Sequence, residues 1–485
     1  MDLALSRYDV VVVGAGAAGG WAAKELSERG LEVALLDAGP LFPVADEGGL
    51  ERRPVQSDCY ACTEESAHLF VDDFDNPFQT AEGTSYRWIR ARQMGGRLHV
   101  WGRTSPRMRD DEFKAASADG VGQDWPISAA DLAPAYSRVE EFLDVKAAPL
   151  VSAERKLKEA IEARWPSRGV EETVWACREP GRMLQAALRT GRVALFAETI
   201  AERVLVAPGG DRARGVAFVD RRTGSRHEIE GRAVVLCASA LESTRLLLNS
   251  ATADHPDGLA NSSGVLGRYL MDHTYGIYYE GLAPPRGEEE YEPRSQGAFM
   301  PGFRNLTEEA AGFLRSYAIE LQVMTRPKPA GRLRRGVRDD FWMSAFGEVL
   351  PNRDNGVELD SSHTDEWGIP TLRVDARYGE NERAMARDQL QTMREMLEAG
   401  GFEITASGTE LSPPGLSAHE LGTARMGDDP ETSVLDAHNR AWEVPNLLVT
   451  DAASFASSGH RNPTLTIMAL TVRACERLAD ELSAG

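Results

Sequence analysis

Glycines near the start of the chain have the spacing of a dinucleotide site. Residues 14–19 read Gly-Ala-Gly-Ala-Ala-Gly, which fits G-x-G-x-x-G, and an acid, Asp37, follows. In such a unit Gly14 makes a tight turn, Gly16 lets backbone approach a pyrophosphate, and Gly19 lets a helix lie close to the sheet. Asp37 can accept hydrogen bonds from a ribose and disfavours a 2′-phosphate, so we expect an unphosphorylated ADP moiety. The expected contacts are Gly14, Gly16, Ala17, Ala18, Gly19, Asp37 and Ala38.

The elements around these glycines are predicted to be a strand, a helix and a second strand. Residues 10–13 form a continuous apolar run, residues 21–28 have a helical pattern, and residues 31–36 form a second apolar run. The N-terminus of the helix would offer free N–H groups and a partial positive charge to the pyrophosphate. Glycines also serve ordinary turns, but the complete unit is typical of dinucleotide binding.

A second group of residues suited to chemistry lies near the C-terminus. His419 begins the segment HELGTARMG, residues 446–451 form a strand ending in Asp451, and Asn462 lies in the segment SSGHRNPTLT. A histidine has the right unperturbed pKa for a base at neutral pH. Asn462 is a good N-cap, and Pro463 suits the first position of the helix that follows. That helix would direct its positive end at whatever lies beside Asn462.

Residues 92–103 (RQMGGRLHVWGR) indicate backbone pressed against a flat ligand, because two adjacent glycines precede a bulky run. The arginines Arg97 and Arg103 could contact phosphates or acids, or could equally be paired on the surface. The expected ligand contacts here are Arg92, Gly95, Gly96, His99, Val100, Trp101 and Gly102.

Length and composition predict a globular protein of two or three domains, with 485 residues, 42% hydrophobic and 27% charged. The net charge of −21 argues against a nucleic-acid partner and would tolerate a neutral or cationic substrate, although it could serve solubility alone. No apolar run approaches the length of a membrane-spanning helix, and no signal peptide is evident. We therefore expect a cytoplasmic protein without membrane contact.

The five cysteines do not form a disulfide framework. Cys59 and Cys62 make a single C-x-x-C, and His68 lies nearby. A zinc site would normally need a second pair or histidines at matching spacing. We expect two free thiols in a loop and no metal.

The middle of the chain is predicted to return to the nucleotide-binding sheet and then to form a second layer. Residues 225–230 and 232–239 read as two strands, followed by a helix over 241–249. Residues 276–411 contain several alternating strands, and residues 380–399 form a long charged helix. Strands with helices on one face indicate an antiparallel layer that covers the substrate.

Four blocks of the sequence together resemble the glucose-methanol-choline (GMC) flavoprotein oxidoreductases. They are the glycine unit with Asp37, GGRLHVWGR at 95–103, AVVLCASALESTRLLLNS at 233–250, and the two C-terminal motifs. GVLGRYLMDH at 264–273 and NGVELD at 355–360 are similar as well. The resemblance covers nearly the full length and is strongest to the bacterial branch of pyranose oxidases and sugar or glycoside dehydrogenases.

The resemblance implies FAD and oxidation of an alcohol CH–OH group by hydride transfer to flavin N5. The family's general base falls on His419, and the residue that holds the substrate oxygen falls on Asn462. His460 could replace or assist His419, or merely brace the turn. A helix N-terminus beside the flavin N1–C2=O edge would stabilise the negative charge gained on reduction. Further cofactor contacts are expected at Val204, Ala238, Asp451, Ala452, Asn462, Pro463 and Thr464.

Two positions depart from the family pattern. Some relatives carry a flavin-linking histidine where this chain has Val100, and His99 lies one residue earlier. His99 could bond to or contact the flavin, or pack beside it or point away; we expect no histidyl link and FAD bound non-covalently. Ser239 stands where relatives often have glycine, which affects the close approach to the adenosine.

The expected fold class is α/β: an FAD-binding, Rossmann-like, doubly wound domain and a substrate domain with a mainly antiparallel sheet covered by helices. The predicted segments are 1–39, 85–110, 185–275 and 412–485 for the FAD-binding domain, 40–84 for a lid or interface loop, 111–184 for a helical connection, and 276–411 for the substrate domain.

The expected partners are a small-molecule alcohol, a sugar or glycoside by the resemblance, and oxygen or a separate electron acceptor. The chain could form a homo-oligomer. The alternatives left open are a non-sugar or aminocyclitol alcohol as substrate, a flavin-bearing lyase without net redox change, a non-catalytic dinucleotide-binding module and an NAD(P)-dependent enzyme.

Overall fold

A computed structural model describes residues 7–41, 70–71, 73, 76–178, 181–285, 297–309, 312–324 and 338–484. Cys59, Cys62 and His68, with most of the predicted 40–84 loop, lie outside the described residues. Within the described part, no helix combines the length and the apolar character needed to cross a bilayer.

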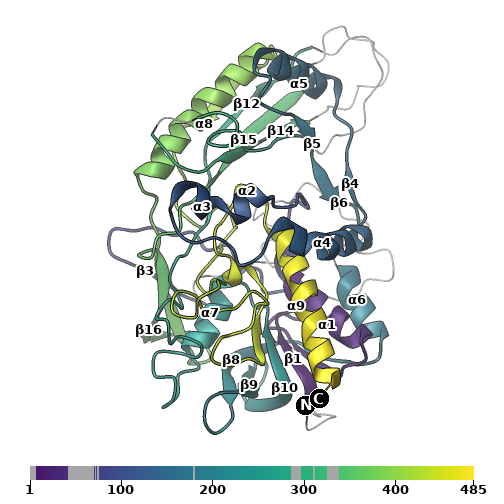
Figure 1. Cartoon of the computed structure of the whole chain (residues 1–485), viewed down its shortest axis with the longest axis vertical. Helices are drawn as coiled ribbons and strands as arrows, with labels where there is room; N and C mark the ends of the chain where they lie inside the picture. The colour runs from purple at the N-terminus through teal and green to yellow at the C-terminus, as the bar shows by residue number, and fades with distance from the viewer. Residues whose placement is uncertain are drawn as a thin grey trace.

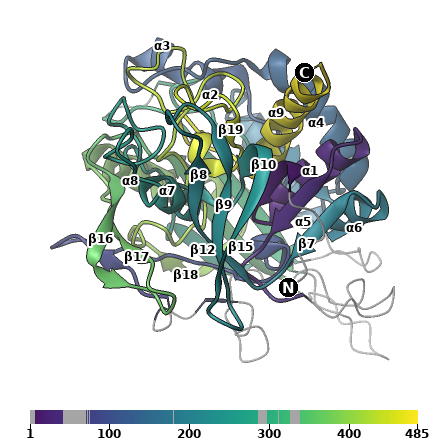
Figure 2. The same cartoon turned by 90° about the horizontal axis from the view of Figure 1, so that it is seen from below.

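The nucleotide-binding layer is built on a parallel sheet. Strand β1 (Tyr8–Val13) lies between β2 (Val33–Leu36) and β10 (Arg226–Leu236), and β7 (Val193–Phe196) and β19 (Leu447–Val449) extend the sheet on either side. These strands are buried apolar runs because helices cover both faces of a parallel sheet. Helix α1 (Ala17–Glu28) follows β1 and packs beside the C-terminal helix α9 (Thr464–Ala484), as Figures 1 and 2 show.

Strand β10 is a single element rather than the two strands predicted over 225–230 and 232–239. Its first half pairs antiparallel with β9 (Ala213–Asp220), and its second half pairs parallel with β1. Gly231, at the change of partner, leaves room for Val11, because an added Cβ would lie 2.9 Å from that side chain. One continuous strand therefore joins the β8–β9 ribbon (β8 is Thr199–Val206) to the parallel sheet.

The second layer is the expected antiparallel sheet with helices on one face, in the strand order β18-β12-β15-β14-β13-β5. Helix α8 (Glu380–Ala399) and helix α5 (Ser152–Arg164) cover one face, and their apolar residues share a core with the strands. The strands are β5 (Glu171–Glu172), β11 (His273–Thr274), β12 (Tyr278–Leu282), β13 (Ala298–Met300), β14 (Tyr317–Met324), β15 (Asp340–Glu348) and β18 (Glu403–Gly408). The α/β fold class predicted from the sequence is confirmed.

Two segments pack differently from their predicted ranges. Strands β16 (Gly356–Thr364) and β17 (Pro370–Asp375) fall in the predicted substrate domain, but they form a separate sheet with β3 (Gln79–Thr80) and pack on α7 (Ala240–Leu248). Helix α5, from the predicted 111–184 connection, joins the second layer. The remaining elements are η2 (Gly96–His99), α2 (Asp110–Phe113), α3 (Ala115–Asp119), α4 (Ala129–Leu143), β4 (Val145–Ala147), β6 (Val174–Ala176), α6 (Gly181–Arg189) and η3 (Ala452–Ser454).

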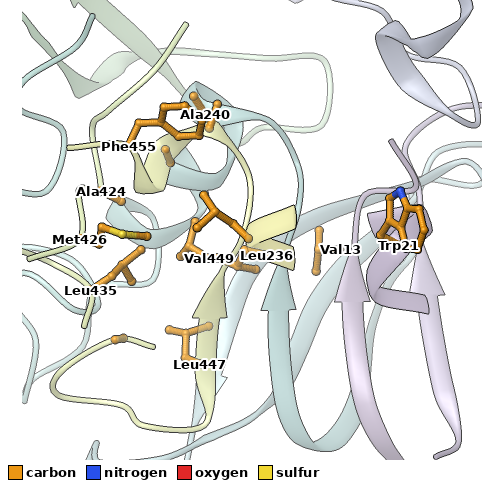
Figure 3. Packing of buried hydrophobic residues seen from close by; sticks show 14 of the residues in the cluster. Val13, Trp21, Leu236, Ala240, Ala424, Met426, Leu435, Leu447, Val449 and Phe455 are labelled. Atoms are coloured by element: carbon orange, nitrogen blue, oxygen red, sulfur yellow. The ribbon is translucent and has the colours of Figure 1, made fainter. Parts of the chain in front are cut away.

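The largest apolar core anchors the C-terminal motif to the parallel sheet. Figure 3 shows Leu236 of β10 and Val449 of β19 beside each other, with Met426 and Phe455 close by. All four side chains are fully buried or nearly so. The segments that carry His419 and Asp451 are therefore fixed against the carboxyl ends of the strands, where ligands bind in open α/β sheets.

Candidate active site

A cavity of about 270 Å³ runs from the turn after β1 to the C-terminal motif. It lies at the carboxyl edge of the parallel sheet and brings together residues that are far apart in the sequence. Of the residues expected to bind the cofactor or to act in catalysis, those in the wall are Gly14, Gly16, Ala17, Ala18, Asp37, Ala38, Arg92, Gly96, Val100, Trp101, Ala238, His419, Asp451, Ala452, Pro463 and Thr464.

Several expected residues lie behind this wall. Val204 donates its N–H to Ser250 Oγ at 2.8 Å, and the start of β8, over residues 199–202, lines the cavity in its place. The ring of His99 turns to its own loop, with Nε2 2.6 Å from the Met94 carbonyl oxygen. The expected residues that are not part of the described cavity wall are Gly19, Gly95, His99, Gly102, Val204, His460 and Asn462.

The glycine unit and Asp37 form one end of the cavity. Gly14 has φ +93°, and an added Cβ would lie 2.4 Å from the Cys237 carbonyl oxygen. The carboxylate of Asp37 accepts the N–H of Ala15 at 2.7 Å and that of Gly39 at 2.8 Å. Burial raises the pKa of Asp37 to about 6, and those two N–H groups oppose the shift. A cavity-lining carboxylate fixed beside a glycine turn fits the ribose and pyrophosphate of an ADP moiety.

The start of α9 forms part of the other end. The sequence predicts Asn462 as its N-cap, but the Pro463 carbonyl accepts the first helical hydrogen bond, from Ile467 N–H at 3.0 Å. The cap is therefore Pro463, one residue later than predicted, because a proline carbonyl can begin the helix as well as an asparagine carbonyl. Pro463 and Thr464 line the cavity, so the positive end of α9 faces it.

Asp451 is fixed in the cavity wall. One carboxylate oxygen accepts the N–H of Ala453 at 3.0 Å, and the other accepts the hydroxyl of Ser243 on α7. Burial raises the pKa of Asp451 to about 6. These bonds tie η3 to α7, and Ala452 lines the cavity.

His419 meets a second buried histidine, His273. Their Nδ1 atoms are 2.8 Å apart, and the two rings are nearly perpendicular, with an interplanar angle of 85°. The Nε2 atom of His273 lies 3.0 Å from the Gly459 carbonyl oxygen. Because a carbonyl only accepts, His273 Nε2 carries a hydrogen. Burial lowers the pKa of His273 to about 4, so the ring is neutral and its Nδ1 is an acceptor.

This network assigns one tautomer to His419. The hydrogen between the two Nδ1 atoms belongs to His419, and its Nε2 therefore bears a free lone pair. Burial lowers the pKa of His419 well below its usual value, and the neighbouring His273 and Arg97 add to the effect. His419 is thus a neutral imidazole in the cavity wall with an unprotonated nitrogen available to accept a proton.

Asp272 holds the loop that carries His419. Its carboxylate accepts the main-chain N–H groups of Gly415, at 2.7 Å, and of His419, at 3.2 Å, together with the hydroxyl of Ser417. The sequence analysis noted the segment 264–273 only as a resemblance and assigned no role to Asp272 or His273. The adjacent Asp-His pair was the available signal, but its contact with His419 depends on the tertiary fold.

His460 lies outside the described cavity wall. Its main-chain N–H donates to Glu112 Oε1 at 3.0 Å, and its ring Nδ1 is 3.6 Å from the same oxygen. Within the described residues its Nε2 has no hydrogen-bond partner. A Cβ added to Gly302 would lie 2.6 Å from this nitrogen. Burial lowers the pKa of His460 to about 3. The ring is therefore directed towards the second layer of the protein.

Comparison with protein families matches three parts of the chain. Models described as GMC oxidoreductase match residues 180–275 and 351–471, and a model described as FAD binding domain matches residues 9–50. The matched ranges contain the glycine unit, the strand β10, His419 and the start of α9.

Relatives that align along nearly the whole chain agree with these family matches. A 2-methyl-1,2-propanediol dehydrogenase of Mycolicibacterium austroafricanum is 28% identical over 100% of this chain and 97% of that protein. A paromamine 6′-oxidase of Streptomyces fradiae is 28% identical over 98% of this chain and 92% of its own length. The crystal structure of a pyridoxine 4-oxidase from Mesorbium loti has the same fold, with a TM-score of 0.68 and 20% identity over 97% of this chain and 98% of that chain. The chain belongs to the GMC oxidoreductase family, whose members depend on FAD.

Proposed function

We propose that this protein oxidises a CH–OH group of a sugar, glycoside or related polyol to a carbonyl, with FAD as the hydride acceptor. The observation that carries the proposal is the neutral His419 imidazole in the cavity wall, with its Nδ1–H given to His273 and its Nε2 free. Bound FAD supplies an electrophilic ring position that takes a hydride from carbon. The site residues fit this cofactor, because the glycine unit and Asp37 line the same cavity as His419.

The protein's own residues would manage the proton and the charge. His419 Nε2 would take the hydroxyl proton while the hydride leaves the carbon. The resulting imidazolium would keep its Nδ1–H bond to His273, which holds the ring in orientation. The positive end of α9 would favour negative charge that develops beside Thr464. Asn462 adjoins this wall, and we assign its carboxamide to holding the substrate oxygen; His460 would brace the turn through Glu112.

The named relatives support an alcohol as substrate. Their names specify oxidation of a diol and of an amino sugar derivative, and both align along nearly the whole chain. We infer a polar, multiply hydroxylated substrate, with oxygen or a separate acceptor taking the electrons afterwards.

Anaerobic reduction of the bound flavin is the experiment that tests the proposal. The holoenzyme is mixed with a panel of sugars, glycosides and simple alcohols without oxygen, and air is then admitted. At least one alcohol is expected to bleach the flavin and to yield its carbonyl product. A substrate that is consumed while the flavin stays oxidised would identify a lyase instead.

The FAD is expected to be held without a covalent bond. Val100, in the position of the linking histidine of some relatives, lines the cavity, and His99 turns to the Met94 carbonyl. Acid precipitation of the holoenzyme should leave the flavin in the supernatant. Flavin absorbance that stays with the precipitated protein would contradict this.

His273 is expected to act as a positioning residue for His419. Removing its Nδ1 acceptor in His273→Ala would let His419 sample the tautomer whose Nε2 is protonated. We expect flavin reduction to slow by roughly 10- to 100-fold, less than the roughly 10⁴-fold cost of a fully wrong tautomer. His273→Asn, which keeps an acceptor oxygen, should recover part of the loss. Equal rates in the alanine and asparagine variants would argue against control of the tautomer.

A further inference from the structure

The antiparallel sheet turns one face towards the catalytic base. On β14, Tyr317, Ile319, Leu321 and Val323 belong to the core shared with α5 and α8, so by alternation Glu320 lies on the opposite face. Phe346 of β15 lies on this opposite face too, and its ring centroid is 6.4 Å from that of His419. We call this face of β12–β15 the substrate face.

Glu320 is a half-buried residue on the substrate face, and one of its two carboxyl oxygens has no partner among the described residues. Its Oε1 is buried and has no hydrogen-bond partner within the described residues. Burial raises the pKa of Glu320 to about 7, and no cation or N–H donor among the described residues opposes the shift. A carboxylate that burial removes from water is costly without a donor, so such a group either takes up a proton or gains a partner.

The other described carboxyl groups whose pKa burial raises markedly each have hydrogen-bond donors or an ion-pair partner. Asp37, Asp272 and Asp451 each accept main-chain N–H groups. Glu348 pairs with Arg315 at 2.9 Å. Glu320 differs from these four because its missing partner must come from outside the described residues.

Aromatic side chains surround Glu320 on the substrate face. The strand register places Glu320 opposite Phe299 of β13 and opposite Ser344 of β15, with Phe346 its diagonal neighbour. Tyr275 stacks on Phe346 with ring centroids 5.9 Å apart, and the Glu320 carboxylate contributes to the raised pKa of Tyr275. A carboxylate among aromatic rings suits an ammonium group, which gains both an ion pair and the attraction of the ring faces.

The spacing indicates how a ligand would lie. Diagonal neighbours across strands are about 7–8 Å apart, and the Phe346 ring lies 6.4 Å from the His419 ring, so the Glu320 carboxyl lies on the order of 10 Å from the His419 ring. This distance fits a molecule whose amine and reacting hydroxyl lie on opposite sides of a sugar ring better than it fits a vicinal amino alcohol.

We propose that Glu320 binds a protonated amine of the substrate, so that the enzyme prefers an amino sugar or an aminocyclitol glycoside over its neutral analogue. The proposal rests on the proposed oxidation of an alcohol and specifies the class of substrate. The ammonium group would supply the donors that Glu320 lacks, and the same contact would hold the reacting hydroxyl towards His419 Nε2. The proton and hydride steps are unchanged.

The test compares glucosamine with glucose on the holoenzyme and on Glu320→Gln. Dissociation constants are measured from the perturbation of the flavin absorbance, and rates from anaerobic reduction. We expect Glu320→Gln to weaken glucosamine binding by about 10-fold or more, as for loss of a charge-assisted hydrogen bond, and to change glucose binding less than about twofold. Glu320→Asp, which keeps the charge, should recover part of the loss. Glu280→Gln, an exposed glutamate on β12 of the same sheet, is the matched control and should leave both sugars unaffected.

A second ligand separates this proposal from the proposed oxidation. Methylammonium cannot be oxidised as an alcohol, yet it should perturb the flavin absorbance of the wild type and not that of Glu320→Gln. If no alcohol reduces the flavin but methylammonium still binds in this way, the oxidation fails and the ammonium site stands. Equal weakening of glucosamine and glucose, or methylammonium binding that persists in Glu320→Gln, would overturn the ammonium site. Flavin content and melting temperature of each variant report whether it has folded.

Discussion

Replacing His419 with alanine should slow flavin reduction by the alcohol substrate by roughly 10²- to 10⁴-fold, the usual contribution of a positioned general base. The variant should keep its FAD, because the substitution leaves the glycine unit, Asp37 and the rest of the cavity wall unchanged. Stopped-flow measurement of flavin reduction without oxygen gives the rate directly. The loss should appear in the limiting rate more than in the substrate's dissociation constant, since the base acts in the transition state.

A surface histidine provides the control for this substitution. His363 is exposed and pairs with Asp360, so His363→Ala should reduce flavin at the wild-type rate. A His419→Ala variant that also keeps the wild-type rate would show that no base is needed at this position, as in a non-catalytic dinucleotide-binding module.

The direction of the pKa shift of His419 sets the pH profile of the wild type. The imidazole acts only when it is unprotonated, and burial lowers its pKa well below 6.5. The rate of flavin reduction should therefore stay constant from neutral pH through about pH 6.5, where an unperturbed histidine would already be half protonated, and should fall only well below that pH. In His419→Ala this acid limb should disappear.

Replacing Gly19 with alanine should abolish stable FAD binding. An added Cβ would lie 1.6 Å from the Gly14 carbonyl oxygen, so α1 would have to move away from β1 and the pyrophosphate site would be distorted. We expect the free energy of unfolding to fall by about 3 kcal/mol or more, at the upper end of the cost of overpacking. Flavin content after purification and chemical denaturation measure the two effects.

The neighbouring glycine is the control. At Gly20 an added Cβ would meet Met183 at 3.5 Å and the Ala15 carbonyl oxygen at 3.8 Å, and both are ordinary contacts. Gly20→Ala should therefore keep both FAD and stability, and it removes a flexible residue from a helix. If Gly19→Ala bound FAD as tightly as Gly20→Ala, the close packing of α1 on β1 would not be what forms the site.

The predicted site residues that the structure brings into one cavity wall depend on local patterns. The glycine unit fixes a turn, a helix start and an acid at the end of the next strand within one short segment, and each part has its own sequence signal. The position of His419 beside a cavity followed from a motif within a recognisable segment. The start of α9 was misplaced by one residue because Asn462 and Pro463 both suit the beginning of a helix.

The parts that were missed depend on contacts across the fold. The single strand β10 was read as two because Gly231 interrupts the apolar pattern, although the backbone continues through it. The contact of His273 with His419 joins two loops from distant parts of the sequence, and neither segment indicates the other. Glu320 reads as a polar position in an alternating strand. The burial of its Oε1, and the absence of a partner for that atom among the described residues, follow only from the way the two layers pack.

The most direct test of the central claim is a single anaerobic turnover with a substrate deuterated at the reacting carbon. If His419 takes the hydroxyl proton while hydride leaves that carbon, each flavin reduced should yield one carbonyl product. The deuterated substrate should also reduce the flavin several-fold more slowly than the ordinary one. Carbonyl formation without flavin reduction would contradict hydride transfer from an alcohol, and so would equal rates for the two substrates when the chemical step limits reduction.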